Sequence, residues 1–137
     1  MMIPCRRCLR GFAQDAAGAT AIEFALVSTA FIAFIFGIVS LSLMLFNNLS
    51  LEWAVTKASR IAEINNSATQ NDVSTAINAY LSQMGLPTAT VTYSSTVGVN
   101  GVRTANISAG YTQTYAVPMI STFTVNFRSA ITVPQPS

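Results

Sequence analysis

The sequence predicts an α+β protein: a long N-terminal transmembrane helix that extends into an exported domain, then a short amphipathic helix and a small antiparallel β-sheet. Three observations support this class. No charged residue occurs between Phe24 and Leu51. Apolar residues then recur at helical spacing from Val73 to Met84, and from Ala89 onward they alternate with polar ones, which is the period of a β-strand.

The uncharged run is long enough to cross a bilayer. From Phe24 to Phe46 nearly every residue is apolar, and at about 1.5 Å per residue this stretch is roughly 34 Å long. The chain has 137 residues, of which 51% are hydrophobic and only 9% charged, so we do not expect a freely soluble protein. This length allows one small domain beside the membrane span.

The charges flanking the run predict its orientation. Arg6, Arg7 and Arg10 precede it and are opposed only by Asp15, whereas the charges beyond its far end balance. The positive-inside rule therefore places the N-terminus in the cytoplasm and the C-terminal domain outside it. A cleaved secretory signal peptide is an alternative, but its apolar region is normally about 7–15 residues and ends in a small-residue cleavage site, which is not seen here.

Small residues in the run share one face of the helix. They recur at spacings of three and four, which lets a second helix approach closely within lipid, and they are Ala30, Ala33, Gly37 and Ser40. We therefore predict helix–helix packing on this stripe.

After the span the helix should continue into water as far as a turn at Asn65-Asn66-Ser67. Trp53 is expected to contact the core of the domain, with a lipid-anchoring role as the alternative. Asn71 or Asp72 is expected to cap the second helix, and Gly85 should end it.

The strand pattern places its apolar residues at odd-numbered positions. A two-residue Asn-Gly turn would put the apolar sets of the first two strands on opposite faces, so we predict a three-residue loop, Val99-Asn100-Gly101. Pro118 should end the second strand, and Pro134–Ser137 should form a loose tail. The expected inward residues are Val91, Tyr93, Val97 and Val99, then Ile107, Ala109, Tyr111, Tyr115 and Val117, then Phe123, Val125, Phe127, Ile131 and Val133.

Several function classes lack the residues they need. The chain has no histidine, and its two cysteines, Cys5 and Cys8, could not complete a four-ligand zinc site alone. Nucleophile–base pairs of the Ser/His or Cys/His type cannot be built, so we predict no enzyme and no cofactor. A net charge of +2 without a basic stripe also argues against nucleic acid as a partner.

The most informative motif lies where the apolar run begins. From Gly18 to Phe24 the sequence reads Gly-Ala-Thr-Ala-Ile-Glu-Phe, with the lone carboxylate of Glu23 at the mouth of the span. An ionisable group at such a position is costly and hence a functional candidate, although Glu23 could simply lie in the headgroup layer. The motif resembles the processing site of type IV pilins and pseudopilins, with Phe24 in place of the usual tyrosine. The stretch Gly18–Val27, followed by Phe36-Gly37-Ile38, resembles the TadE-like pseudopilins of tight-adherence pilus systems, except that Ser28-Thr29 stands where a proline is common.

The resemblance implies a function. A prepilin peptidase would cut after Gly18 and free the amine of Ala19, which Glu23 would neutralise during assembly. Partners would be that peptidase, other pilins and pseudopilins, the pilus assembly platform and the lipid bilayer. The protein would be a minor pilin of the bacterial inner membrane with a pilin-like fold, acting in surface attachment. The alternative is an unprocessed single-pass anchor that displays a small binding module.

The expected segments follow from this interpretation. They are a cytoplasmic leader at 1–18, the transmembrane helix at 19–46, its extension at 47–66, the short helix and loop at 67–88, and the strands and tail at 89–137.

Overall fold

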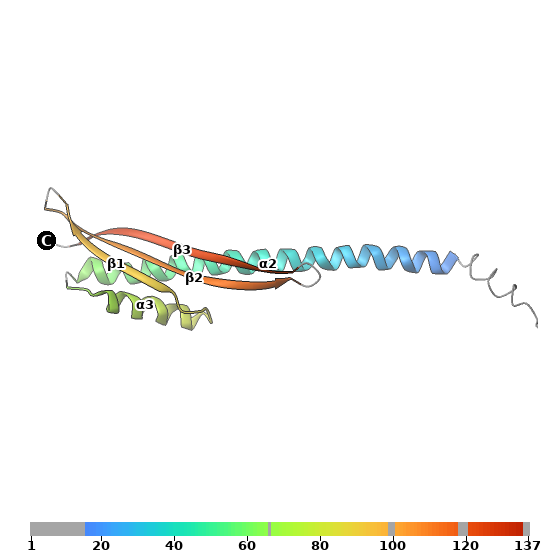
Figure 1. The fold of residues 1–137 in the computed structure, drawn as a ribbon, viewed down its shortest axis with the longest axis horizontal. Helices are drawn as coiled ribbons and strands as arrows, with labels where there is room; N and C mark the ends of the chain where they lie inside the picture. The colour runs from blue at the N-terminus through green and yellow to red at the C-terminus, as the bar shows by residue number, and fades with distance from the viewer. Residues whose placement is uncertain (1–15, 66, 99–100, 118–120, 136–137) are drawn as a thin grey trace, which may run out of the picture. The chain divides into compact units, whose positions relative to one another are not determined.

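The computed structural model describes residues 16–65, 67–98, 101–117 and 121–135; the three arginines of the expected leader lie outside this part. The elements confirm the predicted α+β class (Figure 1). In chain order they are α2 (Ala16–Ile64), α3 (Gln70–Gln83), β1 (Thr90–Val97), β2 (Arg103–Val117) and β3 (Ser121–Gln135).

The chain divides into two compact units, residues 1–38 and residues 39–137. In the first unit, the consecutive residues Phe34, Ile35 and Phe36 are all exposed, and since neighbours on a helix point about 100° apart, no side of α2 is covered there. From Thr20 onward α2 is long and apolar enough to cross a membrane. The protein is accordingly a single-pass membrane protein with one N-terminal apolar helix.

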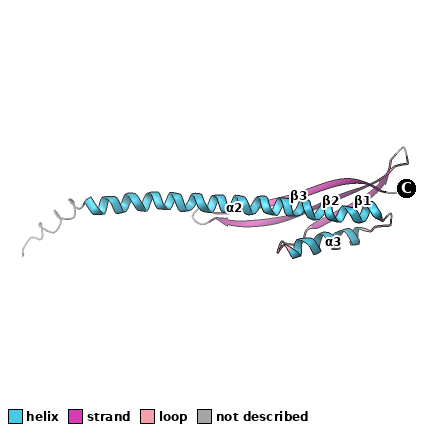
Figure 2. Cartoon of the chain, turned by 180° about the vertical axis from the view of Figure 1, so that it is seen from behind, coloured by secondary structure: helices cyan, strands magenta, loops and turns pink. Residues whose placement is uncertain are grey.

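The second unit is built on a three-stranded antiparallel sheet in the order β1-β2-β3 (Figure 2). Val91 of β1 lies opposite Ala109 of β2, and Tyr111 of β2 lies opposite Phe127 of β3. Odd-numbered residues therefore share one face, as the alternating sequence predicts. On this face most of the apolar side chains are buried, whereas the even-numbered threonines and asparagines of the other face are largely exposed.

The core lies between the odd-numbered face of the sheet and the two helices. Alanines at 54, 58 and 62 of α2 are fully buried; their small side chains, four residues apart, let the sheet approach the helix closely. From α3 the core receives Val73, Ile77 and Leu81, all fully buried. The sheet contributes Val91, Ala105, Ile107, Ala109, Tyr111, Phe127 and Val133.

Both ends of α3 have well-defined caps. The predicted N-cap was wrong: Thr69 occupies it and accepts a hydrogen bond from the Asp72 amide, while the Asp72 carboxylate accepts one from the Thr69 amide at 2.9 Å. The Thr69 hydroxyl also donates to this carboxylate at 2.8 Å, and the bonds from the Thr69 amide and hydroxyl hold the pKa of the Asp72 carboxyl below its usual value. At the other end Gly85 has φ +71°, and the amides of Gly85 and Leu86 donate to the carbonyls of Ser82 and Leu81, the Schellman arrangement.

The register confirms the predicted three-residue loop between β1 and β2. Val97 pairs with Arg103, and the Gly98 amide donates to the Val102 carbonyl at 2.8 Å, which leaves three residues in the turn. Gly101 has φ +75°, a left-handed conformation that favours glycine. Val99 and Asn100 lie outside the described residues.

Three expectations about the strands were wrong. Phe123, expected to point into the core, is 38% exposed near the start of β3, where its ring stacks on that of Tyr115. Val97 is 61% exposed because it sits at the last pair before the loop, opposite the exposed Arg103. Pro134 and Gln135 belong to β3 rather than to a tail. Proline is tolerated there because β3 is an edge strand, whose outward side needs no amide hydrogen.

Candidate functional site

Gly18 lies in the first turns of α2, and nothing inside the described chain requires glycine there. A Cβ atom built on it would meet no atom within 4 Å, and its φ is not in the left-handed range. Glycine in a helix is destabilising by roughly 0.5–1 kcal/mol relative to alanine. A requirement for glycine at this position would therefore come from something outside the chain.

Ala19 and Glu23 lie one turn apart on α2. They are four residues apart in a continuous helix, or about 6 Å along its axis. Glu23 is exposed, and Phe24 beside it is 74% exposed. The described residues of the first unit include no lysine or arginine, so no cationic side chain accompanies Glu23 there.

Ser28 and Thr29 stand where TadE-like pseudopilins often have proline, and both hydroxyls find hydrogen-bond partners within the helix. The hydroxyls of Ser28 and Thr29 donate to the Ala25 carbonyl at 3.1 and 2.7 Å. Such bonds let hydroxyls reside in an apolar segment without unpaired polar atoms. α2 runs through this point as one unbroken helix.

The predicted stripe of small residues lies along α2 with no cover in the described structure. Ala30 and Gly37 are exposed, and Ala33 and Ser40 are half-buried. A Cβ atom at Gly37 would meet nothing within 4 Å. The stripe is therefore open, and whether a second helix packs on it stays a prediction.

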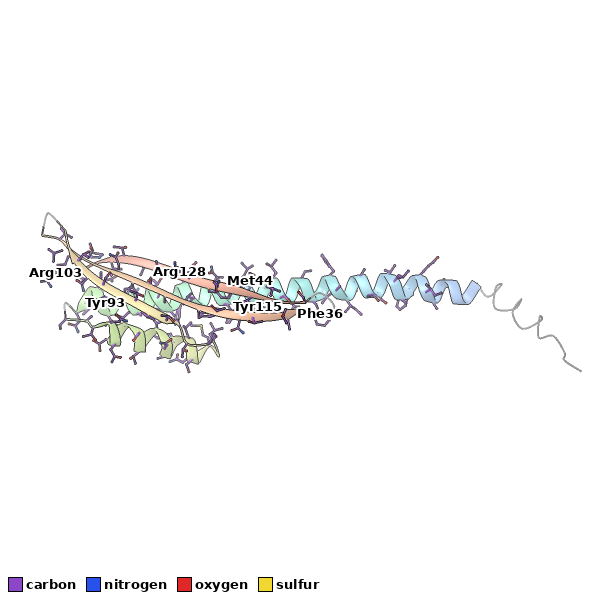
Figure 3. The ribbon with its side chains drawn as sticks, viewed as in Figure 1. Phe36, Met44, Tyr93, Arg103, Tyr115 and Arg128 are labelled. Carbon is purple, nitrogen blue, oxygen red and sulfur yellow. The ribbon has the colours of Figure 1, made fainter. Side chains whose placement is uncertain are left out.

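A polar junction that the sequence pattern did not predict joins α2 to the sheet. Asn47 is only 7% exposed. Its side-chain amide donates to the Tyr115 hydroxyl, and its main-chain carbonyl accepts from the Tyr111 hydroxyl at 3.2 Å. Burial, with a smaller contribution from nearby Tyr115, raises the pKa of Tyr111 to about 12. Met44 packs against the core one turn earlier (Figure 3). The domain thus covers α2 from within the apolar run onward.

The other end of the sheet is tied to α2 by Gln135. Its Nε2 donates to the Tyr93 hydroxyl at 2.9 Å and to the Ala62 carbonyl at 3.5 Å, and its Oε1 accepts from Ser95 at 2.5 Å. Gln135 is 7% exposed, so these bonds compensate the burial of its amide. A buried glutamine next to a C-terminal proline leaves no periodic signal in the sequence.

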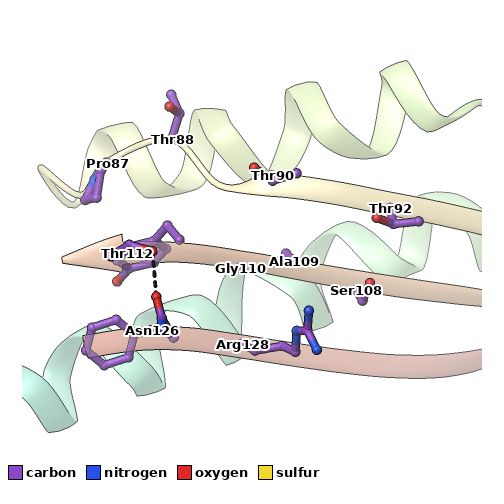
Figure 4. A pocket seen from close by; sticks show the side chains of 12 residues that line it. Pro87, Thr88, Thr90, Thr92, Ser108, Ala109, Gly110, Thr112, Asn126 and Arg128 are labelled. Carbon is purple, nitrogen blue, oxygen red and sulfur yellow. Dashed lines mark hydrogen bonds between the residues drawn. The ribbon is translucent and has the colours of Figure 1, made fainter. Parts of the chain in front are cut away.

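An open hollow of about 670 Å³ lies on the outer face of the sheet around Gly110 (Figure 4). A Cβ atom on Gly110 would lie 2.9 Å from the Phe127 carbonyl oxygen, so glycine is required by close packing against β3. Opposite Gly110 stands Arg128, and Thr112 donates to Asn126 at 2.7 Å nearby. Hydroxyl groups and the guanidinium group of Arg128 line the hollow, and its lining residues include no nucleophile–base pair.

An apolar groove lies on α2 beside the end of α3. It is lined by Phe46, Leu49, Trp53 and Met84 with Ser50, Glu52 and Thr56 among them. Trp53 is 46% exposed, so the expectation that it belongs to the core was wrong. Its ring meets Tyr80 of α3 edge-on at 5.4 Å, and Lys57 Nζ lies 5.6 Å from the ring centroid.

No metal centre is visible in the described part of the chain. There, no three His, Cys, Asp or Glu side chains come together in a way that could hold an ion. Every buried side-chain nitrogen or oxygen among these residues has a hydrogen-bond partner. We take the start of α2, with the motif from Gly18 to Phe24, as the candidate site.

Comparison with known proteins points to the same segment of the chain as the candidate site. Residues 18–60 match the family model described as TadE-like protein. No curated protein and no solved structure matches the chain. TadE-like proteins are structural components of pili and are not known as enzymes. The match confirms the resemblance found in the motif, and it identifies the segment from Gly18 to Arg60 as TadE-like.

Proposed function

We propose that this protein is a minor pilin of a tight-adherence pilus, processed by a prepilin peptidase after Gly18. The observation that carries the proposal is the position of that glycine. The TadE-like match begins there, while neither the backbone nor the packing of the described chain requires glycine at that site. Recognition by a protease would explain the glycine, because a side chain at this position would crowd the scissile bond.

The unprocessed protein would insert with Arg6, Arg7 and Arg10 on the cytoplasmic face. Cleavage then turns Ala19 into the first residue of α2 and gives it a free, charged amine. Glu23 lies one turn further on, within reach of that amine or of one on a neighbouring subunit. Pairing the two charges offsets the cost of removing both from water when subunits pack together.

The remainder of the molecule fits a role in assembly. The open stripe of Ala30, Ala33, Gly37 and Ser40 offers a surface on which another apolar helix could exchange lipid contacts for helix contacts. The α+β domain would then be displayed outside the membrane, where it contacts other pilus components. The size of the domain favours a minor subunit over the shaft subunit, which in these systems is little more than a helix.

The decisive test is the N-terminus of the membrane-extracted protein, measured by mass spectrometry in hosts with and without the prepilin peptidase. We expect a start at Ala19 only when the peptidase is present. Gly18→Phe should block cleavage, whereas Gly37→Phe, the same change at an equally open glycine, should not. A start at Met1 or Met2 in both hosts would leave the plain membrane anchor as the better account.

A further inference from the structure

The apolar groove on α2 is exposed on a side of the helix that the sheet leaves free. Asn47, Leu51 and Ala54 of the same segment are buried against the sheet. Phe46, Leu49 and Trp53, spaced by three and four residues, share another face and are 51%, 62% and 46% exposed. Large apolar side chains grouped in this way usually meet a partner.

The groove is continuous with the membrane-spanning segment. The 28 uncharged residues from Phe24 to Leu51 would extend about 42 Å as a helix, which equals the thickness of a bilayer with its headgroup layers, about 40–45 Å. Glu23 and Glu52 bracket this run. Leu49 lies about 4.5 Å beyond Phe46 along the axis, within a headgroup layer of about 5–7.5 Å. The backbone of Trp53 lies about 10.5 Å beyond Phe46, just past that layer, and its side chain tilts back toward it because helical side chains lean toward the N-terminus of their helix.

The composition of the groove suits that layer. Tryptophan is enriched at membrane–water interfaces because its ring is apolar and its indole N–H is polar. Thr56 and Lys57 follow Trp53 along α2 and so place polar groups on the water side of the patch, and Glu52 lies on its rim. Met84, at the end of α3, adds an apolar side chain from a second element to the same surface.

We propose that this groove seats the domain on the outer leaflet of the bilayer, with lipid at the boundary between headgroups and acyl chains as its occupant. Phe46 and Leu49 enter this boundary, and Trp53 lies among the headgroups. The domain is thereby held against the membrane by α2 and by the end of α3 together. This proposal depends on the membrane span and on its predicted orientation, and not on pilus assembly.

Trp53 is the only tryptophan in the chain, so its fluorescence reports this site alone. The full-length protein would be placed, one chain per disc, in phosphatidylcholine nanodiscs with spin labels either on the headgroup or at acyl carbon 12. We expect headgroup labels to quench Trp53 at least twofold more than carbon-12 labels, and iodide in the water to quench it weakly. Strong iodide quenching without headgroup quenching would show an open, unseated groove and overturn the proposal.

A variant distinguishes seating from mere proximity to the membrane. Leu49→Asp places a charge in the groove at a side chain that is 62% exposed, so the fold should survive, which circular dichroism would verify. We expect headgroup quenching to fall, and iodide quenching to rise, by at least twofold. Val97→Asp, a matched change at a 61% exposed residue far along the sheet, should alter neither. Unchanged quenching in Leu49→Asp would refute lipid seating through the groove.

Discussion

The two parts of α2 use opposite kinds of side chain. Up to Ile38 the helix carries exposed large apolar residues on every side except the stripe that includes Ala30, Ala33 and Gly37. From Val39 to Ile64 one face carries Ala54, Ala58 and Ala62, and these small residues are completely buried. Large side chains suit the part of the helix that contacts lipid, while small side chains suit the part on which the sheet packs.

This contrast shows that hydrophobicity alone does not locate the core of the domain. The most apolar stretch of the chain contributes nothing to it, whereas a segment interrupted by Glu52, Lys57 and Arg60 contributes five buried residues. Burial follows from having a partner within the chain. The following variants test the two parts separately, beginning with the largest expected effect.

In the membrane part, Glu23→Ala should leave insertion and cleavage intact but strongly reduce piliation. A buried charge left without its partner costs about 3 kcal/mol or more, which corresponds to more than about a hundredfold in an assembly equilibrium. Pilus counts by electron microscopy and the N-terminus of the membrane form would be measured together. Glu63→Ala, at an exposed position of the same helix, is the control. Normal piliation in Glu23→Ala would remove Glu23 from the assembly mechanism.

In the domain part, Ala58→Leu should be severely destabilising, because the added carbons would force the sheet away from α2. Overpacking a closed core costs about 1–3 kcal/mol or more. The free energy of unfolding of the full chain in detergent would be measured by denaturant titration. Ala79→Leu adds the same atoms on an exposed face of α3 and should be nearly neutral. Equal stability of the two variants would contradict close packing at Ala58.

Gly110→Ala tests the contact between β2 and β3. The new methyl carbon would lie 2.9 Å from the Phe127 carbonyl oxygen, so the strands must shift, at a cost of about 1–2 kcal/mol. Thermal unfolding followed by circular dichroism would measure the loss. Gly37→Ala, where the same methyl meets nothing, should not lower the melting temperature. A stable Gly110→Ala protein would mean that the sheet yields freely there.

Thr69→Ala should remove the N-cap of α3 and destabilise the domain by about 1 kcal/mol. Thr75→Ala, at an exposed position inside the same helix, provides the matched control. Because the pKa of Asp72 is lowered by its bonds to Thr69, part of the stability of the wild type should be lost as the pH falls through that pKa. Acid titrations that coincide for the wild type and Thr69→Ala would argue against the capping box.

The smallest effect should appear at high pH. The pKa of Tyr111 rises from about 10 to about 12 on folding, so the folded state holds this proton more tightly. The corresponding stability is fully present below pH 10 and is lost as the pH rises to about 12. Denaturant midpoints measured between pH 9 and 12 should fall less steeply for Tyr111→Phe than for Tyr80→Phe. If the midpoints of the two variants fall in parallel, the raised pKa of Tyr111 is not the cause of the loss of stability at high pH.

Periodicity in the sequence predicted the elements, the shared face of the strands and the three-residue loop, because each follows from local spacing. It did not predict that Asn47 is buried or that Trp53 is half-exposed, since both depend on which side of α2 the sheet occupies. Gln135 joined β3 through long-range bonds to Tyr93 and Ala62 that no local pattern records. The motif around Gly18 was recognisable because its requirements lie along the chain itself.

The tie between Gln135 and Ala62 sets an order of events during synthesis. The last strand supplies Phe127 and Val133 to the core, so the domain cannot close until nearly the whole chain has been made. At about 5–20 residues per second, the roughly 70 residues between Ile64 and Gln135 take several seconds to translate. During that interval α2 is already complete, and its alanines at 54, 58 and 62 have no strand to cover them. The helix therefore exists for several seconds before the domain that packs on it can close.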